Sequence, residues 1–215
     1  MKLEESLDNA FRKYDINDPF REKIIGMLDT VKKADTATYE HSLRVGLLSA
    51  RIGEFSELDP KPLLYGGLLH DVGKSTIDPA LLRKGDAFTD EDMERVRQHV
   101  LNGYFLLKSI FPFTAELVVR HHTYQENSYP NIPESEIKFP RKSKLVISIY
   151  SRIIALADFY DALTTRQNKK FIDGSNLSES KIIDIVVKNN PDREGLIRSL
   201  SDAEIFKGFY DDIRD

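Results

Sequence analysis

The chain of 215 residues contains no cysteine and has no long apolar run. Without cysteine it can form no disulfide, no zinc–thiolate site and no thiol nucleophile. Its apolar stretches stay well short of the roughly 20 residues that a membrane helix needs. Residues 1–15 carry charge from the start, whereas a signal peptide has an apolar centre. We therefore expect a cytoplasmic protein without a membrane partner.

A surplus of positive charge is also missing. Lysine and arginine number 31 against 35 aspartate and glutamate residues, which gives a net charge of −4. This balance excludes a globally basic nucleic-acid-binding protein, so we expect no nucleic-acid partner. A hydrophobic content of 40% at this length is enough for one compact domain with a substantial core.

Apolar residues recur at helical spacing through most of the sequence, and strand patterns are weak. The clearest helical periods cover 39–55, 61–71, 90–111, 114–122 and 145–165, with shorter ones from 178 to 213. These periods predict an all-α fold. The segment 124–144 holds three prolines and is the one clear irregular region. A long loop of this kind is either functional or a solvated excursion, and the sequence favours neither.

All five histidines lie within or at the end of apolar helical segments. They are His41, His70, His99, His121 and His122, and the carboxylates Asp71 and Asp158 have equally apolar neighbours. Burying such groups is costly unless something compensates, and a divalent transition metal does so by binding neutral imidazole and carboxylate. Seven ligands are too many for one tetrahedral ion. They suit two neighbouring ions with a shared carboxylate and a bridging water, an arrangement used in phosphoester hydrolysis.

Each of these residues, taken singly, also has an ordinary structural interpretation. A lone histidine such as His41 is usually a hydrogen-bonded core residue, and the pair His70–Asp71 can end a helix. Asp158 can pair with Arg152 or with Arg166. Taken together, these interpretations require every histidine to fall by accident on the helices that carry the buried acids. The joint pattern therefore favours a metal centre.

The ordered set of histidines and aspartates resembles the HD-domain metal-dependent phosphohydrolases. The resemblance rests on HDVGK at 70–74 and ALADFYDALTTR at 155–166, and the additional histidines are similar to those of the HD-GYP branch. It implies a single HD-domain helical bundle with short helical extensions at both ends. The implied divisions are an N-terminal extension at 1–36, a catalytic core at 37–171, and a C-terminal extension at 172–215 packed on the core.

The resemblance also implies that the chain binds two divalent ions. Iron and manganese are the first candidates, and nickel, cobalt and zinc are the alternatives. One ion would be held by His41, His70, Asp71 and Asp158, and the other by Asp71, His99, His121 and His122, with Asp71 shared. Asp71 and Lys74 would be catalytic, and Lys74 and Arg166 would contact the substrate phosphate. The family's R-P-Y is RQN here, so Lys169 and Lys170 are further candidates for that contact.

Two departures from the family pattern matter. The loop after the paired histidines usually reads D-G-x-G-Y-P, but here it reads QENSYP at 125–130, so that Tyr129 and Pro130 remain while both glycines are gone. Glycine permits positive φ and close approach of a ligand, so the pocket is expected to differ. A third metal would need a glutamate at the position of Ala37, and the adjacent Glu40 points elsewhere on the helix. We expect no third site of that type.

The predicted function is metal-dependent hydrolysis of a cyclic dinucleotide, with cyclic di-GMP as the first candidate. Three alternatives stay open at this point: hydrolysis of another nucleotide or phosphoester, a ligand-binding signalling module that does not hydrolyse, and a di-iron oxygenase. Fold resemblance alone does not choose among them. The partner is thus a small phosphoester or nucleotide. The amphipathic end segments predict packing surfaces or, alternatively, the interface of a homodimer.

Overall fold

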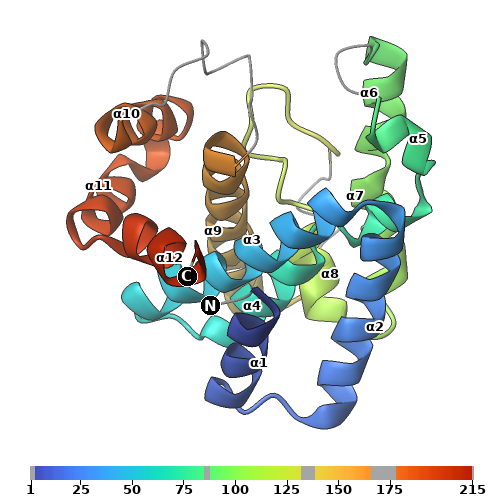
Figure 1. The fold of residues 1–215 in the computed structure, drawn as a ribbon, viewed down its shortest axis with the longest axis horizontal. Coiled ribbons are helices and arrows are strands. Elements are labelled where there is room, and N and C mark those ends of the chain that lie inside the picture. The colour runs from blue at the N-terminus through green and yellow to red at the C-terminus, as the bar shows by residue number, and fades with distance from the viewer. Residues whose placement is uncertain (1–2, 85–87, 132–138, 166–177, 215) are drawn as a thin grey trace.

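The computed structural model describes residues 3–84, 88–131, 139–165 and 178–214, and every regular element within these ranges is helical (Figure 1). The predicted all-α fold is confirmed. The elements in chain order are α1 (Leu3–Lys13), α2 (Asp18–Ala34), α3 (Thr36–Phe55), α4 (Pro60–Leu69), the 3₁₀ helix η1 (Val72–Thr76), α5 (Pro79–Leu82), α6 (Asp90–Arg97), α7 (His99–Leu107), α8 (Pro112–Val118), α9 (Arg141–Thr165), α10 (Glu179–Asn189), the 3₁₀ helix η4 (Pro191–Arg193), α11 (Glu194–Asp202) and α12 (Ile205–Arg214).

The two amino-terminal helices pack on α3 and share one apolar core with it. Asn17 caps α2, and the Asp35 carboxylate accepts the Thr38 backbone N–H at 2.7 Å to begin α3. Phe11 of α1 and Leu43 of α3 are almost completely buried in this core. Residues 3–36 are therefore joined to the remainder by shared packing as well as by sequence.

Two close backbone contacts bring the site residues together. A Cβ on Gly67 of α4 would lie 2.6 Å from the Cα of Gly46 of α3, so only glycine allows this approach. A Cβ on Gly73 of η1 would lie 1.9 Å from the carbonyl oxygen of His99 at the start of α7. These contacts draw together α3, the α4–η1 junction and α7, which all carry predicted metal ligands.

The long helix α9 runs through the middle of the molecule (Figure 1). It contacts α3, α4 and α8, and Ile147, Ile154 and Leu156 are almost completely buried. The helices α10 to α12 fold back beside it, and the rings of Tyr160 and Phe206 stack with centroids 4.1 Å apart. The carboxyl-terminal helices thus share the core of α9.

Several predicted helix boundaries were wrong. The period at 90–111 is split into α6 and α7, which meet at Gln98. The predicted helix 61–71 ends at Leu69, and His70 and Asp71 form the turn that leads into the 3₁₀ helix η1. A continuous α-helix would direct His70 and Asp71 about 100° apart, whereas this turn lets both face the same centre. The predicted helix 114–122 ends at Val118, which leaves the paired histidines in a turn.

No helix within the described ranges is both long enough and apolar enough to cross a membrane. The cytoplasmic location, the homodimer and the domain division at residues 36 and 171 stay predictions. The second of those divisions lies outside the described residues.

Candidate metal centre

The seven predicted metal ligands converge from five separate parts of the chain. His41 comes from α3, the pair His70–Asp71 from the α4–η1 junction, and His99 from the first position of α7. The pair His121–His122 follows α8, and Asp158 lies on α9. All are buried except His122, which is half-buried. The structure therefore brings together every side chain that the sequence singled out as a ligand.

The carboxylate of Asp71 lies between two groups of histidines. Its Oδ2 is 3.4 Å from His70 Nε2 and 4.0 Å from His41 Nε2, whereas its Oδ1 is 3.2 Å from His99 Nε2. Asp158 Oδ1 faces the same ring nitrogen, 3.0 Å from His41 Nε2. The two oxygens of Asp71 thus face different histidines, as a shared ligand requires.

Three overlapping groups of side chains have ligand atoms within 4.8 Å of one another. They are His41, His70 and Asp71; His70, His121 and Asp158; and His99, His121 and His122. His70 belongs to the first two of these groups, and His121 belongs to the last two. The ligand atoms therefore form one continuous cluster of donors.

Every histidine of the cluster has its Nδ1 occupied by an outer partner. His70, His99 and His121 each place Nδ1 against the backbone carbonyl three residues earlier, at 2.7, 2.7 and 2.5 Å. His41 Nδ1 lies 2.6 Å from Asp161 Oδ2, and His122 Nδ1 lies 2.7 Å from the side-chain amide of Gln125. For His41, His70, His99 and His121 the partner is an oxygen, so an Nδ1–H that donates outward fixes the tautomer and directs the Nε2 lone pair inward. The Gln125 amide nitrogen is itself a donor, so His122 Nδ1 accepts from it.

Four inward-facing atoms are buried without a hydrogen-bond partner in the described part of the chain. They are Nε2 of His70, His99 and His121, and Oδ1 of Asp71. An unsatisfied buried polar atom costs roughly 1–3 kcal/mol, so several in one place mark a site that something else completes. Imidazole nitrogens together with carboxylate oxygens suit a divalent transition metal. The residues present therefore fit a bound metal.

The protonation of Asp71, His121 and His122 also suits a cation, whereas burial lowers the pKa of His70 but the neighbouring Asp71 and Asp158 carboxylates outweigh burial and raise it. Burial opposes ionisation of Asp71, yet the Lys74 ammonium, 2.6 Å away, and the His70 imidazole hold the pKa of that carboxyl well below its usual range. Burial lowers the pKa of His122 to about 3 and that of His121 well below its usual value. Their imidazoles are thus neutral at pH 7, which is the form that binds metal.

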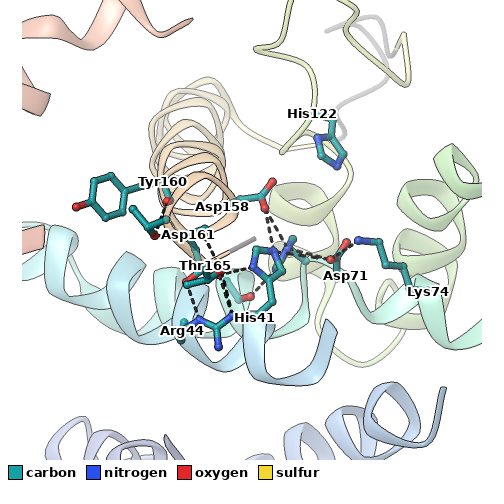
Figure 2. Close-up of polar contacts among 12 residues, drawn as sticks. His41, Arg44, Asp71, Lys74, His122, Asp158, Tyr160, Asp161 and Thr165 are labelled. Atoms are coloured by element: carbon teal, nitrogen blue, oxygen red, sulfur yellow. Dashed lines mark hydrogen bonds and ion pairs between the residues drawn. The ribbon is translucent and has the colours of Figure 1, made fainter. Parts of the chain in front are cut away.

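Asp161 is a central residue of the site that the sequence analysis did not single out. It is fully buried on α9, where Oδ2 faces His41 and Oδ1 accepts from Arg44 Nε at 2.7 Å and from the Tyr210 hydroxyl at 2.6 Å (Figure 2). Burial raises its pKa, but the hydrogen bonds from His41 and Arg44 outweigh burial and lower the pKa to about 2. Its position three residues after Asp158, on the same helix face, was the available signal.

The structure tests one of the two ion pairs that the sequence allowed for Asp158. Arg152 does not pair with Asp158, because its guanidinium donates to Asp192 and to Asn190. That alternative was wrong. The other candidate partner, Arg166, lies outside the described residues, as do Lys169 and Lys170.

The described part of the loop after the paired histidines lies against the site. The Tyr129 ring stacks on His122 with centroids 4.6 Å apart, and the Arg97 guanidinium lies 5.1 Å from the centre of the Tyr129 ring. Together with the Gln125 contact, this favours a functional loop over a solvated excursion. The predicted irregular region also ends earlier than expected, because α9 begins at Arg141.

A cavity of about 570 Å³ opens beside the cluster. It is lined by Asp71, Lys74, His122, Tyr124, Gln125, Glu126, Asn127, Arg152, Ala155, Asp158, Phe159, Ala162, Leu163, Lys188, Asn189 and Asn190. This volume lies within the usual range for small-molecule sites. The cluster therefore forms one end of a pocket that α9, the loop and the end of α10 enclose.

The sequence model of the HD domain matches residues 38–163. The chain belongs to the HD domain family. This match covers the whole span from His41 to Asp158 and more than half of the chain, which confirms the resemblance noted from the motifs.

Among curated proteins, this HD-domain chain is 30% identical over 178 residues to a cyclic di-GMP phosphodiesterase of Thermotoga maritima, covering 78% of this chain and 45% of the relative. It is 29% identical to a cyclic di-GMP phosphodiesterase of Pseudomonas aeruginosa, covering 70% and 35%. A 3′3′-cGAMP-specific phosphodiesterase of Vibrio cholerae is 24% identical, covering 77% and 31%. The chain thus spans less than half the length of each of these relatives.

Among solved structures, the HD domain of the Listeria monocytogenes phosphodiesterase PgpH in complex with cyclic di-AMP matches with a TM-score of 0.60. The sequences are 17% identical, and the match covers 84% of this chain and 93% of that one. This likeness shows a shared fold and confirms the HD-domain bundle.

Proposed function

We propose that this chain is a metal-dependent phosphodiesterase that hydrolyses a cyclic dinucleotide, with cyclic di-GMP as its first candidate substrate. The observation that carries the proposal is the set of buried, inward-facing ligand atoms next to a pocket that Asp71, Lys74, His122 and Asp158 line. Membership of the HD domain family and the relatives named for cyclic di-GMP and cGAMP support the same reaction and substrate class.

The proposed centre holds two divalent ions, as in the HD-GYP branch. His41, His70, Asp71 and Asp158 would bind one, and Asp71, His99, His121 and His122 would bind the other. The opposite directions of the two Asp71 oxygens support its role as the shared ligand. When bound, such ions supply a coordinated water of lowered pKa and positive charge for the phosphate oxygens.

The side chains around the centre position and stabilise the reacting groups. Lys74 lines the pocket, so its ammonium can contact a substrate phosphate and offset the charge that develops on its oxygens. Asp161 keeps the His41 imidazole in one orientation and one tautomer. Asp158 and His122 also line the pocket and so place the centre in direct contact with the bound substrate. Arg166 remains a proposed second phosphate contact.

The test is hydrolysis by the purified chain after reconstitution with iron or manganese. The substrates are cyclic di-GMP, 3′3′-cGAMP, cyclic di-AMP and the small diester bis(p-nitrophenyl) phosphate. We expect metal-dependent cleavage, with cyclic di-GMP preferred. Lys74→Met should lower kcat/KM by about tenfold or more, whereas Lys61→Met, which removes an exposed lysine at the start of α4, should not. Metal-loaded protein that binds cyclic di-GMP without cleaving it would support a signalling module instead.

A further inference from the structure

The pocket contains a carboxylate that the proposed reaction does not use. Glu126 lies in the loop after the paired histidines and lines the cavity together with its neighbours Gln125 and Asn127. It is exposed, and it forms no hydrogen bond or ion pair within the described ranges of the chain. The other acids of the lining, Asp71 and Asp158, both belong to the metal cluster. Among the described lining residues, Glu126 is therefore the acid that stays available to a ligand.

The loop is anchored on both sides of Glu126. On one side, the Tyr124 hydroxyl lies 2.8 Å from the Ser151 hydroxyl of α9. On the other side, the Tyr129 backbone N–H donates to the His122 carbonyl oxygen at 3.4 Å, and the Tyr129 ring stacks on the His122 imidazole. These contacts tie the loop to α9 and to the cluster, and they keep Glu126 beside the cavity.

A free carboxylate is an unexpected group in a pocket for an anionic ligand. The phosphates of a nucleotide are negatively charged, so a nearby acid weakens their binding by like-charge repulsion. Three cations also line the pocket, Lys74, Arg152 and Lys188, but none of them forms an ion pair with Glu126. We therefore expect Glu126 to contact a part of the ligand that donates hydrogen bonds.

The base is the part of a nucleotide that donates hydrogen bonds. On its Watson–Crick edge, guanine presents two neighbouring donors, N1–H and N2–H, which match the two oxygens of a carboxylate. Adenine presents an unprotonated N1 at the same position, and the lone pair of that nitrogen repels a carboxylate. Hypoxanthine keeps N1–H but lacks the 2-amino group. A glutamate therefore favours guanine over hypoxanthine, and hypoxanthine over adenine.

We propose that Glu126 determines the specificity of this pocket for guanine, by accepting hydrogen bonds from N1–H and N2–H of the base. The proposal rests on the proposed function, because the metal cluster would bind a phosphate of the same nucleotide. Glu126 directly follows Gln125, whose side chain contacts His122, so the base and the phosphate of one nucleotide can reach the two groups together. The cavity of about 570 Å³ leaves room for a base beside the cluster.

The test is equilibrium binding of GMP, IMP and AMP to the full metal-loaded chain, measured by isothermal titration calorimetry. We expect GMP to bind more tightly than IMP, and IMP more tightly than AMP. Glu126→Gln should weaken GMP binding about tenfold or more. It should leave AMP binding unchanged or slightly tighter, because it removes one negative charge beside the phosphate. Glu126→Asp keeps the carboxylate and should keep the order of the three nucleotides. The matched control is Glu22→Gln, which removes an exposed glutamate of α2 that does not line the pocket and should change no affinity.

The outcomes separate this role of Glu126 from the proposed reaction. If Glu126→Gln leaves GMP binding unchanged or strengthens it, the role is overturned, even if cyclic di-GMP is cleaved. Equal weakening of all three nucleotides also overturns it, because they carry the same phosphate and differ only in the base. A wild type that does not prefer GMP to AMP overturns it as well. If the wild type cleaves no cyclic dinucleotide but its preference for GMP depends on Glu126, the proposed reaction fails and the role of Glu126 stands.

Discussion

The two sides of the histidine–aspartate cluster are held by different means. On one side, His41 is oriented by Asp161, which itself receives hydrogen bonds from Arg44 of α3 and Tyr210 of α12. On the other side, His122 lies in a turn, and its Nδ1 faces Gln125, an exposed loop residue. Figure 2 shows His122 apart from the connected network around His41. One side is thus fixed by a charged network in the core, and the other by a surface loop.

The two sides therefore differ in how rigidly they are held and in how directly a ligand in the pocket can reach them. The His41 side is enclosed by α3, α9 and α12, whereas His122 and Asp158 line the pocket. Groups fixed by several buried hydrogen bonds hold a ligand geometry at little further entropic cost. A histidine carried by a loop can move as a ligand enters or leaves. We therefore expect substitutions on the His41 side to have larger effects on metal affinity than those on the His122 side.

The largest effect is expected where the two sides meet. Asp71→Ala removes the carboxylate that faces both groups of histidines. Activity should fall on the order of a thousandfold or more, because several kcal/mol of metal-derived stabilisation are lost. Elemental analysis should show less metal per chain. Asp212→Ala is the matched control, since this exposed carboxylate pairs with Arg51 on the surface. Full activity and metal content in Asp71→Ala would refute the assignment.

The next effect tests the charged network behind His41. Asp161→Asn keeps the shape but removes the charge that faces Arg44 and His41. Loss of such an outer partner typically lowers metal affinity 10- to 100-fold, and it leaves the Arg44 guanidinium without its carboxylate. Metal titration together with the melting temperature measures both consequences. The control is Asp212→Asn. Unchanged affinity in Asp161→Asn would show that the two sides do not differ in the way proposed.

The sequence analysis found the ligands of the centre because chemistry restricts where they can lie. A histidine or aspartate on an apolar helix face is costly, so His41, Asp71 and Asp158 stood out. Asp161 did not, because an acid three residues further along a helix is also common on solvated faces. HDVGK and ALADFYDALTTR were specific enough to indicate the family and hence the fold.

Contacts between distant parts of the chain could not be predicted in the same way. Tyr210 reaches Asp161 across 49 residues, and Arg152 reaches Asp192 across 40. Neither tyrosine nor arginine is unusual in its local sequence, so periodicity carries no signal for these pairs. Helix ends were also missed where tertiary packing decides them. The close approach of Gly73 to His99 lies at the start of α7, where the predicted helix 90–111 is divided.

A smaller effect should come from the hydroxyl of Tyr210. Tyr210→Phe keeps the buried ring but removes the 2.6 Å hydrogen bond to Asp161 Oδ1. Arg44 and His41 still hold that carboxylate, so we expect metal affinity to fall only about three- to tenfold. Tyr150→Phe is the matched control, because Tyr150 is equally buried in the same core but lies outside the network of Asp161. An equal loss of affinity in both variants would indicate a general effect of core polarity.

The smallest effect is expected on the loop side. Gln125→Ala removes the side chain that faces His122 Nδ1, but water can replace an exposed partner. Metal affinity should therefore fall only about two- to threefold, since the Tyr129 ring still stacks on the imidazole. Ser128→Ala, an exposed change in the same loop, is the control and should have no effect. A loss in Gln125→Ala as large as that in Asp161→Asn would overturn the contrast. It would show that the loop orients His122 as firmly as the buried network orients His41.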